Sequence, residues 1–235
     1  VHGIIANNWY EKQSSEMVYC AGDGSRETVC NCEKNHTDVI STDGQMSPHQ
    51  MLTTTIGDEM QLFNPESKVI GISLKDRGAI LSAGHAADAA YWMDSKGEWI
   101  TSSYYMDELP DWLKEFQDEN PSSNYLKGDW KVEEKFSHNL DSLFINKGGS
   151  GIKSTPFGNT ILKKLAIEIL QNEKLGLGNS TDFLSVSFSS TDYIGHQYGP
   201  HAAEIKDTSN FTLSSNYEFY GAVKLFASNK NLTFN

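Results

Sequence analysis

Residues 68–74 read KVIGISL, a short run dominated by apolar and β-branched side chains. Strands in a parallel sheet are covered on both faces and carry continuous apolar runs, whereas half-exposed strands alternate with polar residues. The run therefore predicts a strand that is buried on both faces.

The stretch before this strand carries the signals of a helix start. Ser47 suits an N-cap, Pro48 suits the first helical position, and Gln50 suits the capping-box position, so we predict a helix that begins at Ser47. Apolar residues recur behind it every three or four positions, at Leu52, Ile56, Met60 and Phe63. This spacing predicts one buried helical stripe, and a helix followed by a buried strand is the α/β pattern.

The remainder of the chain continues the pattern. Residues 89–94 (AAYWMD), a turn-like Ser-Lys-Gly and residues 98–105 (EWITSSYY) predict a hairpin, and Pro110 predicts the first turn of a short helix. Residues 147–158 predict a loop, the apolar spacing over 162–170 predicts a helix, and DFLSVSFSSTD at 182–192 predicts a strand that ends in polar residues. We expect one domain over 1–235, with a mainly parallel sheet flanked by helices and a hairpin-bearing insertion from about 89 to 130.

Charge and hydropathy limit the partners. The net charge of −12 repels polyanions, so we expect no nucleic-acid partner. No run reaches the roughly 18 apolar residues that a membrane helix needs, so we expect no membrane association. A bound phosphate would need local positive charge, from a metal or from a few placed basic residues.

The three cysteines are Cys20, Cys30 and Cys32, and with His36 they could form a zinc site. Paired CxxC motifs are absent, however, so the spacing favours a disulfide from Cys20 to Cys30 or Cys32 in an oxidising compartment.

Two candidate metal ligands lie at the end of the stretch 182–192 and just beyond it. Asp192 and His196 are four residues apart, so one turn of chain can bring a carboxylate oxygen and an imidazole nitrogen to the same point, and zinc accepts both ligand types. Ligands in open α/β sheets bind beyond the carboxyl ends of strands, where this pair lies. The alternative is a surface pair joined by a hydrogen bond.

Two cations follow the strand at 68–74. Lys75 and Arg77 would point to opposite sides of an extended chain, but Gly78 suggests a turn that brings them together. They would then capture phosphate, with the guanidinium as a bidentate fork; the alternative is a solvated loop. Asn7 near the start can donate hydrogen bonds to a phosphate oxygen, or can serve a local turn.

Three segments together resemble a known family. HGIIANNWY (2–10), SLKDRGAILSAGHAADAAYW (73–92) and VSFSSTDYIGHQYGP (186–200) are similar, in this order, to the PafA-like alkaline phosphatases, which are relatives of the type I phosphodiesterases and nucleotide pyrophosphatases. The similarity extends from Val1 to about Thr208.

The resemblance implies a zinc-dependent hydrolase of small phosphate monoesters, in which a threonine nucleophile attacks phosphorus between two zinc ions. It implies that Asp192 and His196 bind one zinc, and that Lys75, Arg77 and Asn7 contact the phosphate oxygens. Their positive charge suits a dianionic monoester better than a monoanionic diester. A periplasmic or secreted location is implied as well, whereas nothing sets the oligomeric state.

The same resemblance implies what this chain lacks. The family's nucleophile precedes the segment that begins at Val1, and its later zinc ligands have no match after Thr208. We therefore expect a fragment with part of the active site and little activity of its own. The alternatives are a phosphodiesterase or nucleotide pyrophosphatase, and a non-catalytic binding protein that retains the fold.

Overall fold

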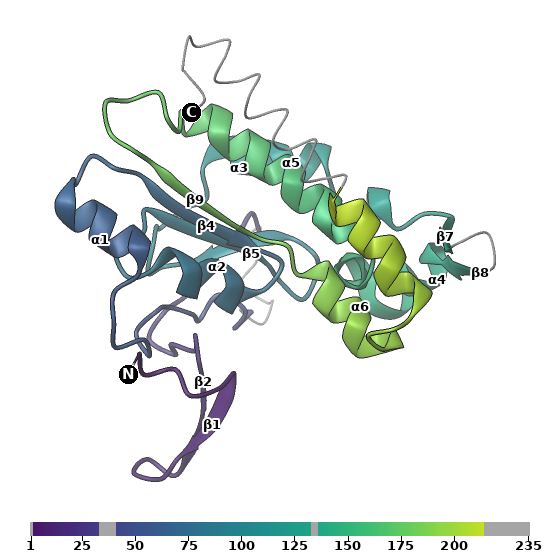
Figure 1. Cartoon of the computed structure of the whole chain (residues 1–235), viewed down its shortest axis with the longest axis horizontal. Coiled ribbons are helices and arrows are strands. Elements are labelled where there is room, and N and C mark those ends of the chain that lie inside the picture. The colour runs from purple at the N-terminus through teal and green to yellow at the C-terminus, as the bar shows by residue number, and fades with distance from the viewer. Residues whose placement is uncertain (1, 33–40, 133–135, 214–235) are drawn as a thin grey trace. The chain divides into compact units, whose positions relative to one another are not determined.

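The computed structural model of the 235-residue chain describes residues 2–32, 41–132 and 136–213 (Figure 1). The chain divides into two compact units, which are described in turn. The first comprises Val1–Asp94, Trp99–Lys114 and Ser180–Ser187, and the second comprises Ser95–Glu98, Glu115–Asn179 and Phe188–Asn235. That residues 1–235 form one domain remains a prediction.

A five-stranded sheet is the centre of the first unit (Figure 1). Its order is β3-β6-β5-β4-β9, with β3 at Thr28–Val29, β4 at Val69–Ser73, β5 at Ala89–Met93, β6 at Trp99–Ser102 and β9 at Phe183–Ser187. Every residue of β4 is buried, and β4 pairs in parallel with β5 and β9, which confirms the strand predicted from KVIGISL. β6 pairs with β5, and β3 pairs with β6, both in antiparallel fashion, so the sheet is mixed.

The predicted hairpin is confirmed, and its position is informative. β5 and β6 pair with Trp92 opposite Ile100 and Met93 opposite Trp99. Gly97 lies in the connecting turn with φ +90, a conformation that favours glycine. Both strands belong to the central sheet, with β5 between β4 and β6. That residues 89–130 are an insertion relative to other family members stays a prediction.

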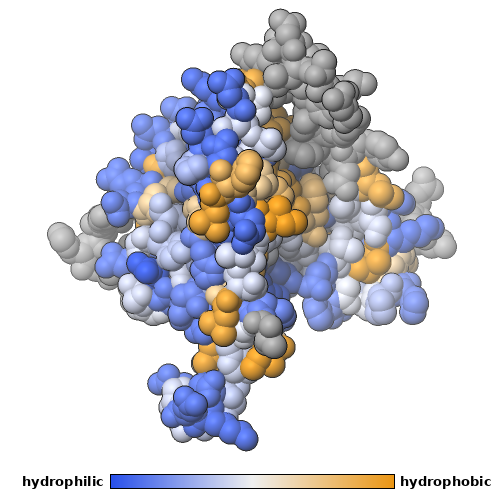
Figure 2. All heavy atoms as spheres, turned by 60° about the vertical axis from the view of Figure 1, so that its left-hand side comes forward, coloured by the Kyte–Doolittle hydropathy of each residue, from blue (hydrophilic) through white to orange (hydrophobic). Residues whose placement is uncertain are grey.

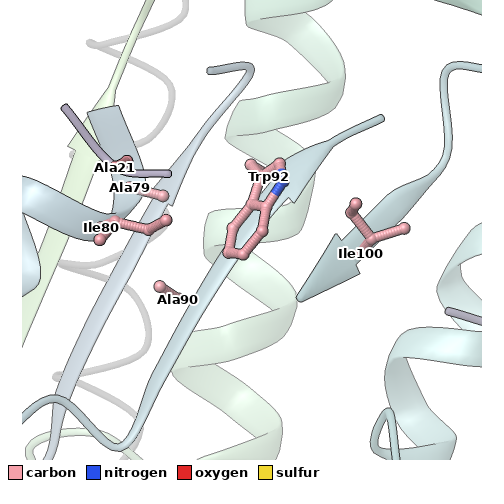
Figure 3. Close-up of a cluster of buried hydrophobic side chains, with 6 residues drawn as sticks. All are labelled: Ala21, Ala79, Ile80, Ala90, Trp92 and Ile100. Carbon is pink, nitrogen blue, oxygen red and sulfur yellow. The ribbon is translucent and has the colours of Figure 1, made fainter. Parts of the chain in front are cut away.

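Helix α2 (Asp76–Ala83) packs against this sheet. A Cβ atom on Gly71 of β4 would collide with the carbonyl oxygen of Ala79, so the close approach of helix and strand requires glycine. Figure 3 shows the apolar cluster, which joins Ala21, Ala79, Ile80, Ala90, Trp92 and Ile100. The burial of these side chains fixes α2 at the end of β4.

The predicted helix start at Ser47 is wrong. Helix α1 spans Ile56–Phe63, and its N-cap is Thr55, which forms a capping box with Asp58. The Ser47 hydroxyl instead donates a hydrogen bond to Asp23 Oδ2 at 2.6 Å. This side chain therefore binds a residue distant in the sequence and does not cap a helix.

The predicted burial of the stripe on this helix is also wrong. Leu52, Ile56 and Phe63 are 78%, 72% and 92% exposed. Figure 2 shows apolar side chains gathered on the face that bears α1.

Two antiparallel strands precede the sheet in sequence, β1 (Asn8–Glu11) and β2 (Glu16–Tyr19). The cysteine prediction is wrong: the disulfide joins Cys30 and Cys32, and Cys20 is a free, buried thiol. Cys20 directly follows β2 and is buried, and this burial raises the pKa of the thiol. His36 lies outside the described residues, so the zinc alternative that involves it is untested.

The second unit is mainly helical. Helix α3 (Asp111–Glu119) links the two units in sequence and begins directly after Pro110, close to the predicted start. Helix α5 (Phe157–Asn172) confirms the helix predicted over 162–170, with Ile161, Leu162, Leu165, Ala166 and Ile169 buried. Within the predicted loop at 147–158, the structure has a 3₁₀ helix, η2 (Gly148–Ser154), so that prediction holds only in part.

The other elements of this unit are η1 (Ser122–Tyr125), β7 (Asp129–Val132), β8 (Phe136–Asn139), α4 (Leu140–Lys147) and α6 (Ser190–Tyr198). A further helix begins at Ala203 and continues to the end of the described residues. In the described ranges, no helix is long and apolar enough to cross a membrane.

Candidate functional site

Lys75 and Arg77 lie where β4 passes into α2. Lys75 is the N-cap of α2 and Arg77 lies in its first turn, so the segment is a helix start and not a loop; whether the two cations bind phosphate or are only solvated stays a prediction. The carboxyl end of a parallel strand and the N-terminus of a helix meet here. Peptide dipoles place partial positive charge at such a helix start, which adds to the two cationic side chains.

A tyrosine that the sequence analysis did not single out holds Arg77. The Tyr19 hydroxyl donates to Asp76 Oδ1 at 2.6 Å and accepts from Arg77 Nη1 at 3.2 Å. Asp76 Oδ1 also accepts from the Arg77 backbone amide at 2.6 Å. Burial, followed by the charge of Asp76, raises the pKa of Tyr19 far above its ordinary value, so the phenol stays protonated and can fill both roles.

Asn7 approaches this group through the backbone. The Asn7 carbonyl oxygen accepts from the Cys20 amide at 3.0 Å, directly after Tyr19. The Asn7 side chain is exposed, so its amide is open to a ligand. Hydrogen bonds of the backbone and of side chains thus connect Asn7, Tyr19 and Arg77 within the first unit. We call these three residues, together with Lys75 and Asp76, the Tyr19 patch.

Asp192 and His196 lie one turn apart on α6, in the second unit. His196 Nε2 is 3.5 Å from Asp192 Oδ1, and the two side chains are 81% and 54% exposed. A tetrahedral zinc bonded at about 2.0–2.1 Å to both atoms would separate them by roughly 3.3 Å. The separation is therefore compatible with two ligands of one zinc ion, and equally with the surface ion pair that is the alternative.

The described residues contain no group of three or more His, Cys, Asp or Glu side chains placed to hold a metal. Asp192 and His196 would therefore offer two protein ligands, and water or further side chains would complete the coordination shell. The donor types, one carboxylate and one imidazole, are those of catalytic zinc sites.

The model of the type I phosphodiesterase and nucleotide pyrophosphatase family matches residues 1–211. The chain belongs to this family. It is 38% identical to alkaline phosphatase PhoV of Synechococcus elongatus, over 88% of this chain and 41% of PhoV. It is 41% identical to a protein of Myroides odoratus named a calcium-transporting ATPase, over 88% of this chain and 42% of that protein.

The fold agrees with a solved member of the superfamily. The crystal structure of wild-type alkaline phosphatase PafA matches 98% of this chain and 47% of PafA, with a TM-score of 0.87 and 32% identity. The PafA-like alkaline-phosphatase resemblance and the α/β fold are thereby confirmed, and the chain comes from a family of phosphatase-type hydrolases. It spans less than half the length of the relatives that it matches.

Proposed function

We propose that this chain carries the phosphate-binding side chains, and one ligand pair of the zinc site, of a phosphate monoester hydrolase. The observation that carries the proposal is the Tyr19 patch. Two cations and the start of α2 lie together at the end of a buried parallel strand, in a chain whose net charge is −12. The two cations outnumber the one carboxylate of the patch, Asp76, so the patch carries a net positive charge that would favour an anion.

The chemistry of each side chain fits a phosphoryl group. Arg77 presents a planar fork to two oxygens, and Lys75 supplies a point charge. The Asn7 amide supplies a neutral donor. The non-bridging oxygens of a monoester carry a double negative charge, which two full cations and a helix start stabilise more strongly than the single charge of a diester.

Asp192 and His196 would hold a zinc ion, which supplies Lewis-acid stabilisation of a phosphoryl or attacking oxygen when it is bound. In the proposal the intact site binds two zinc ions, of which this pair holds one. His196 must then be neutral to bind metal, and Asp192 ionised. A periplasmic or secreted location also belongs to the proposal, and the Cys30–Cys32 disulfide supports an oxidising compartment.

Titration of the chain with inorganic phosphate tests the anion site. Isothermal calorimetry should show binding that Arg77→Ala weakens by about 1.5–3 kcal/mol, the usual range for a hydrogen bond to a charged group. Lys127→Ala removes one positive charge from an exposed position in the other unit and serves as the matched control. Equal losses of phosphate affinity in both variants would mean that only the net charge of the chain matters, which would contradict the proposal.

A second candidate function is a phosphodiesterase or nucleotide pyrophosphatase, which the matched family model favours. Comparing phenyl phosphate with diphenyl phosphate as ligands of the same chain separates the two. Tighter binding of the phenyl phosphate dianion supports the monoesterase, whereas preference for the diester would overturn it.

Zinc titration tests the metal pair. With two of the expected ligands the chain should bind zinc only weakly, and His196→Ala should abolish the remaining heat of binding because the imidazole is one of the two proposed protein donors. His201→Ala, which alters an exposed histidine just beyond the helix, is the control. Zinc binding that survives in His196→Ala would place the metal elsewhere.

A further inference from the structure

The antiparallel hairpin of β1 and β2 extends from the Tyr19 patch (Figure 1). Asn7 directly precedes β1, and Tyr19 is the last residue of β2. The Tyr19 hydroxyl contacts Asp76 and Arg77. The hairpin therefore begins and ends at the proposed phosphate site, and its turn lies farthest from that site.

The register of the two strands determines which side chains share a face with Tyr19. Asn8 pairs with Tyr19, and Tyr10 pairs with Met17. Directly opposite residues project to the same side of a sheet, and so do residues two apart on one strand, so these four side chains lie on one face. Two residues of strand span about 7 Å. The Tyr10–Met17 pair is therefore the next pair outward from Tyr19 on this face.

The Tyr10–Met17 pair is apolar and largely exposed. Tyr10 is 58% exposed, and Met17 is 67% exposed. Both side chains favour aromatic partners, because a tyrosine ring forms stacked or edge-to-face contacts and a methionine sulfur makes favourable contacts with rings. A ligand whose phosphate binds at Arg77 would thus have an apolar surface beside its phosphate.

The charges of the hairpin limit what else such a ligand can carry. Glu11 and Glu16 form the outermost pair, on the face opposite Tyr10. The hairpin from 8 to 19 contains these two carboxylates and one cation, Lys12, so its net charge is −1. A second anionic group on the ligand would be repelled here, whereas an uncharged organic group would not.

We propose that Tyr10 and Met17 form a subsite for the organic group of the phosphate ester, so that the site prefers monoesters of aromatic alcohols to esters of small or charged alcohols. This inference rests on the proposed phosphate site at Arg77. The two residues determine specificity in this proposal, and neither takes part in the chemical step.

The test compares phenyl phosphate with methyl phosphate as ligands of the 235-residue chain by calorimetric titration. Phenyl phosphate should bind about twofold to twelvefold more tightly, the usual range for an aromatic contact. Tyr10→Ala should remove most of this preference and leave the affinity for methyl phosphate unchanged, because the methyl group is too small to reach the pair. Met17→Ala should reduce the preference less, and Tyr10→Phe, which retains the ring, should preserve it.

Leu62→Ala is the matched control, because Leu62 is 70% exposed on α1 of the same unit and its loss should change neither affinity. A preference for phenyl phosphate that survives in both Tyr10→Ala and Met17→Ala would place the organic group elsewhere and overturn the inference. Equal losses of both affinities in Tyr10→Ala would mean that the side chain only supports the fold, which would overturn it as well.

Two further outcomes separate this inference from the proposed function. If inorganic phosphate binds and Arg77→Ala weakens it, but the wild-type chain binds both esters equally, the phosphate site stands and the subsite does not. Self-association of the wild-type chain that Tyr10→Ala abolishes would mean that a second copy covers the pair, which also overturns the subsite. A chain that binds neither ester nor inorganic phosphate would refute the phosphate site, and the subsite with it.

Discussion

Replacement of Tyr19 by phenylalanine is the sharpest test of the Tyr19 patch, because it removes one oxygen and keeps the ring. The change breaks the 2.6 Å bond to Asp76 and the 3.2 Å bond from Arg77. Each bond involves a charged group, for which the usual contribution is about 1.5–3 kcal/mol. Asp76 and Arg77 are only partly buried, so water replaces much of the loss, and we expect the free energy of unfolding to fall by about 1–2 kcal/mol.

The effect on phosphate binding follows from the freedom that Arg77 gains. Immobilising a long side chain again on binding costs about 0.5–1.5 kcal/mol. Phosphate affinity should therefore fall by about twofold to twelvefold in Tyr19→Phe. Calorimetric titration with inorganic phosphate measures this fall, and urea unfolding measures the stability.

Tyr10→Phe, on the adjacent strand β1 and 58% exposed, is the matched control and should leave both quantities unchanged. The reasoning fails if Arg77→Ala weakens phosphate binding while Tyr19→Phe does not. A pH series adds an independent check. Because the pKa of Tyr19 is raised in the folded state, its contribution to stability is present at neutral pH and is lost as the pH rises above about 10. Tyr19→Phe should lack that alkaline loss.

Three further predictions concern the first unit. Gly71→Ala should destabilise it by about 3 kcal/mol in urea unfolding, because the new methyl group meets the Ala79 carbonyl oxygen; a neutral effect would contradict the close packing of β4 and α2. Burial alone would raise the pKa of Asp23, but hydrogen bonds, that from Ser25 foremost, hold it below its usual value. Its stabilising effect is thus lost as the pH falls below about 4, and Asp23→Asn should flatten the acid side of the stability curve in urea midpoints measured at several pH values. Phe63→Ser should raise solubility and change the unfolding free energy by less than about 0.5 kcal/mol, because the ring is 92% exposed; a large loss of stability would mean that the face of α1 is covered.

Patterns that allow one solution were predicted correctly. KVIGISL is short, apolar on both faces and rich in β-branched residues, which together favour a strand covered on both sides, and β4 is such a strand. The apolar spacing within α5 and the aromatic strands of the β5–β6 hairpin are equally specific. Asp192 and His196 were predicted to meet within one turn, and a helical turn does bring them to 3.5 Å.

Signals that depend on a distant partner were misjudged. Ser47 has the chemistry of an N-cap, but its hydroxyl binds Asp23. The spacing of Ile56 and Phe63 is that of a buried stripe, but periodicity shows which residues share a face and not what covers it. Cysteine positions in the sequence likewise do not determine which two sulfur atoms meet.

The sequence alone determined the α/β class and the superfamily, and its motifs predict the site residues Asn7, Lys75, Arg77, Asp192 and His196. These follow from local apolar patterns and from contiguous motifs, which a single segment contains completely. Only the tertiary structure decided that Tyr19 holds Arg77. This is a contact between segments nearly 60 residues apart, and such contacts arise when packing brings the segments together, because no local pattern encodes them.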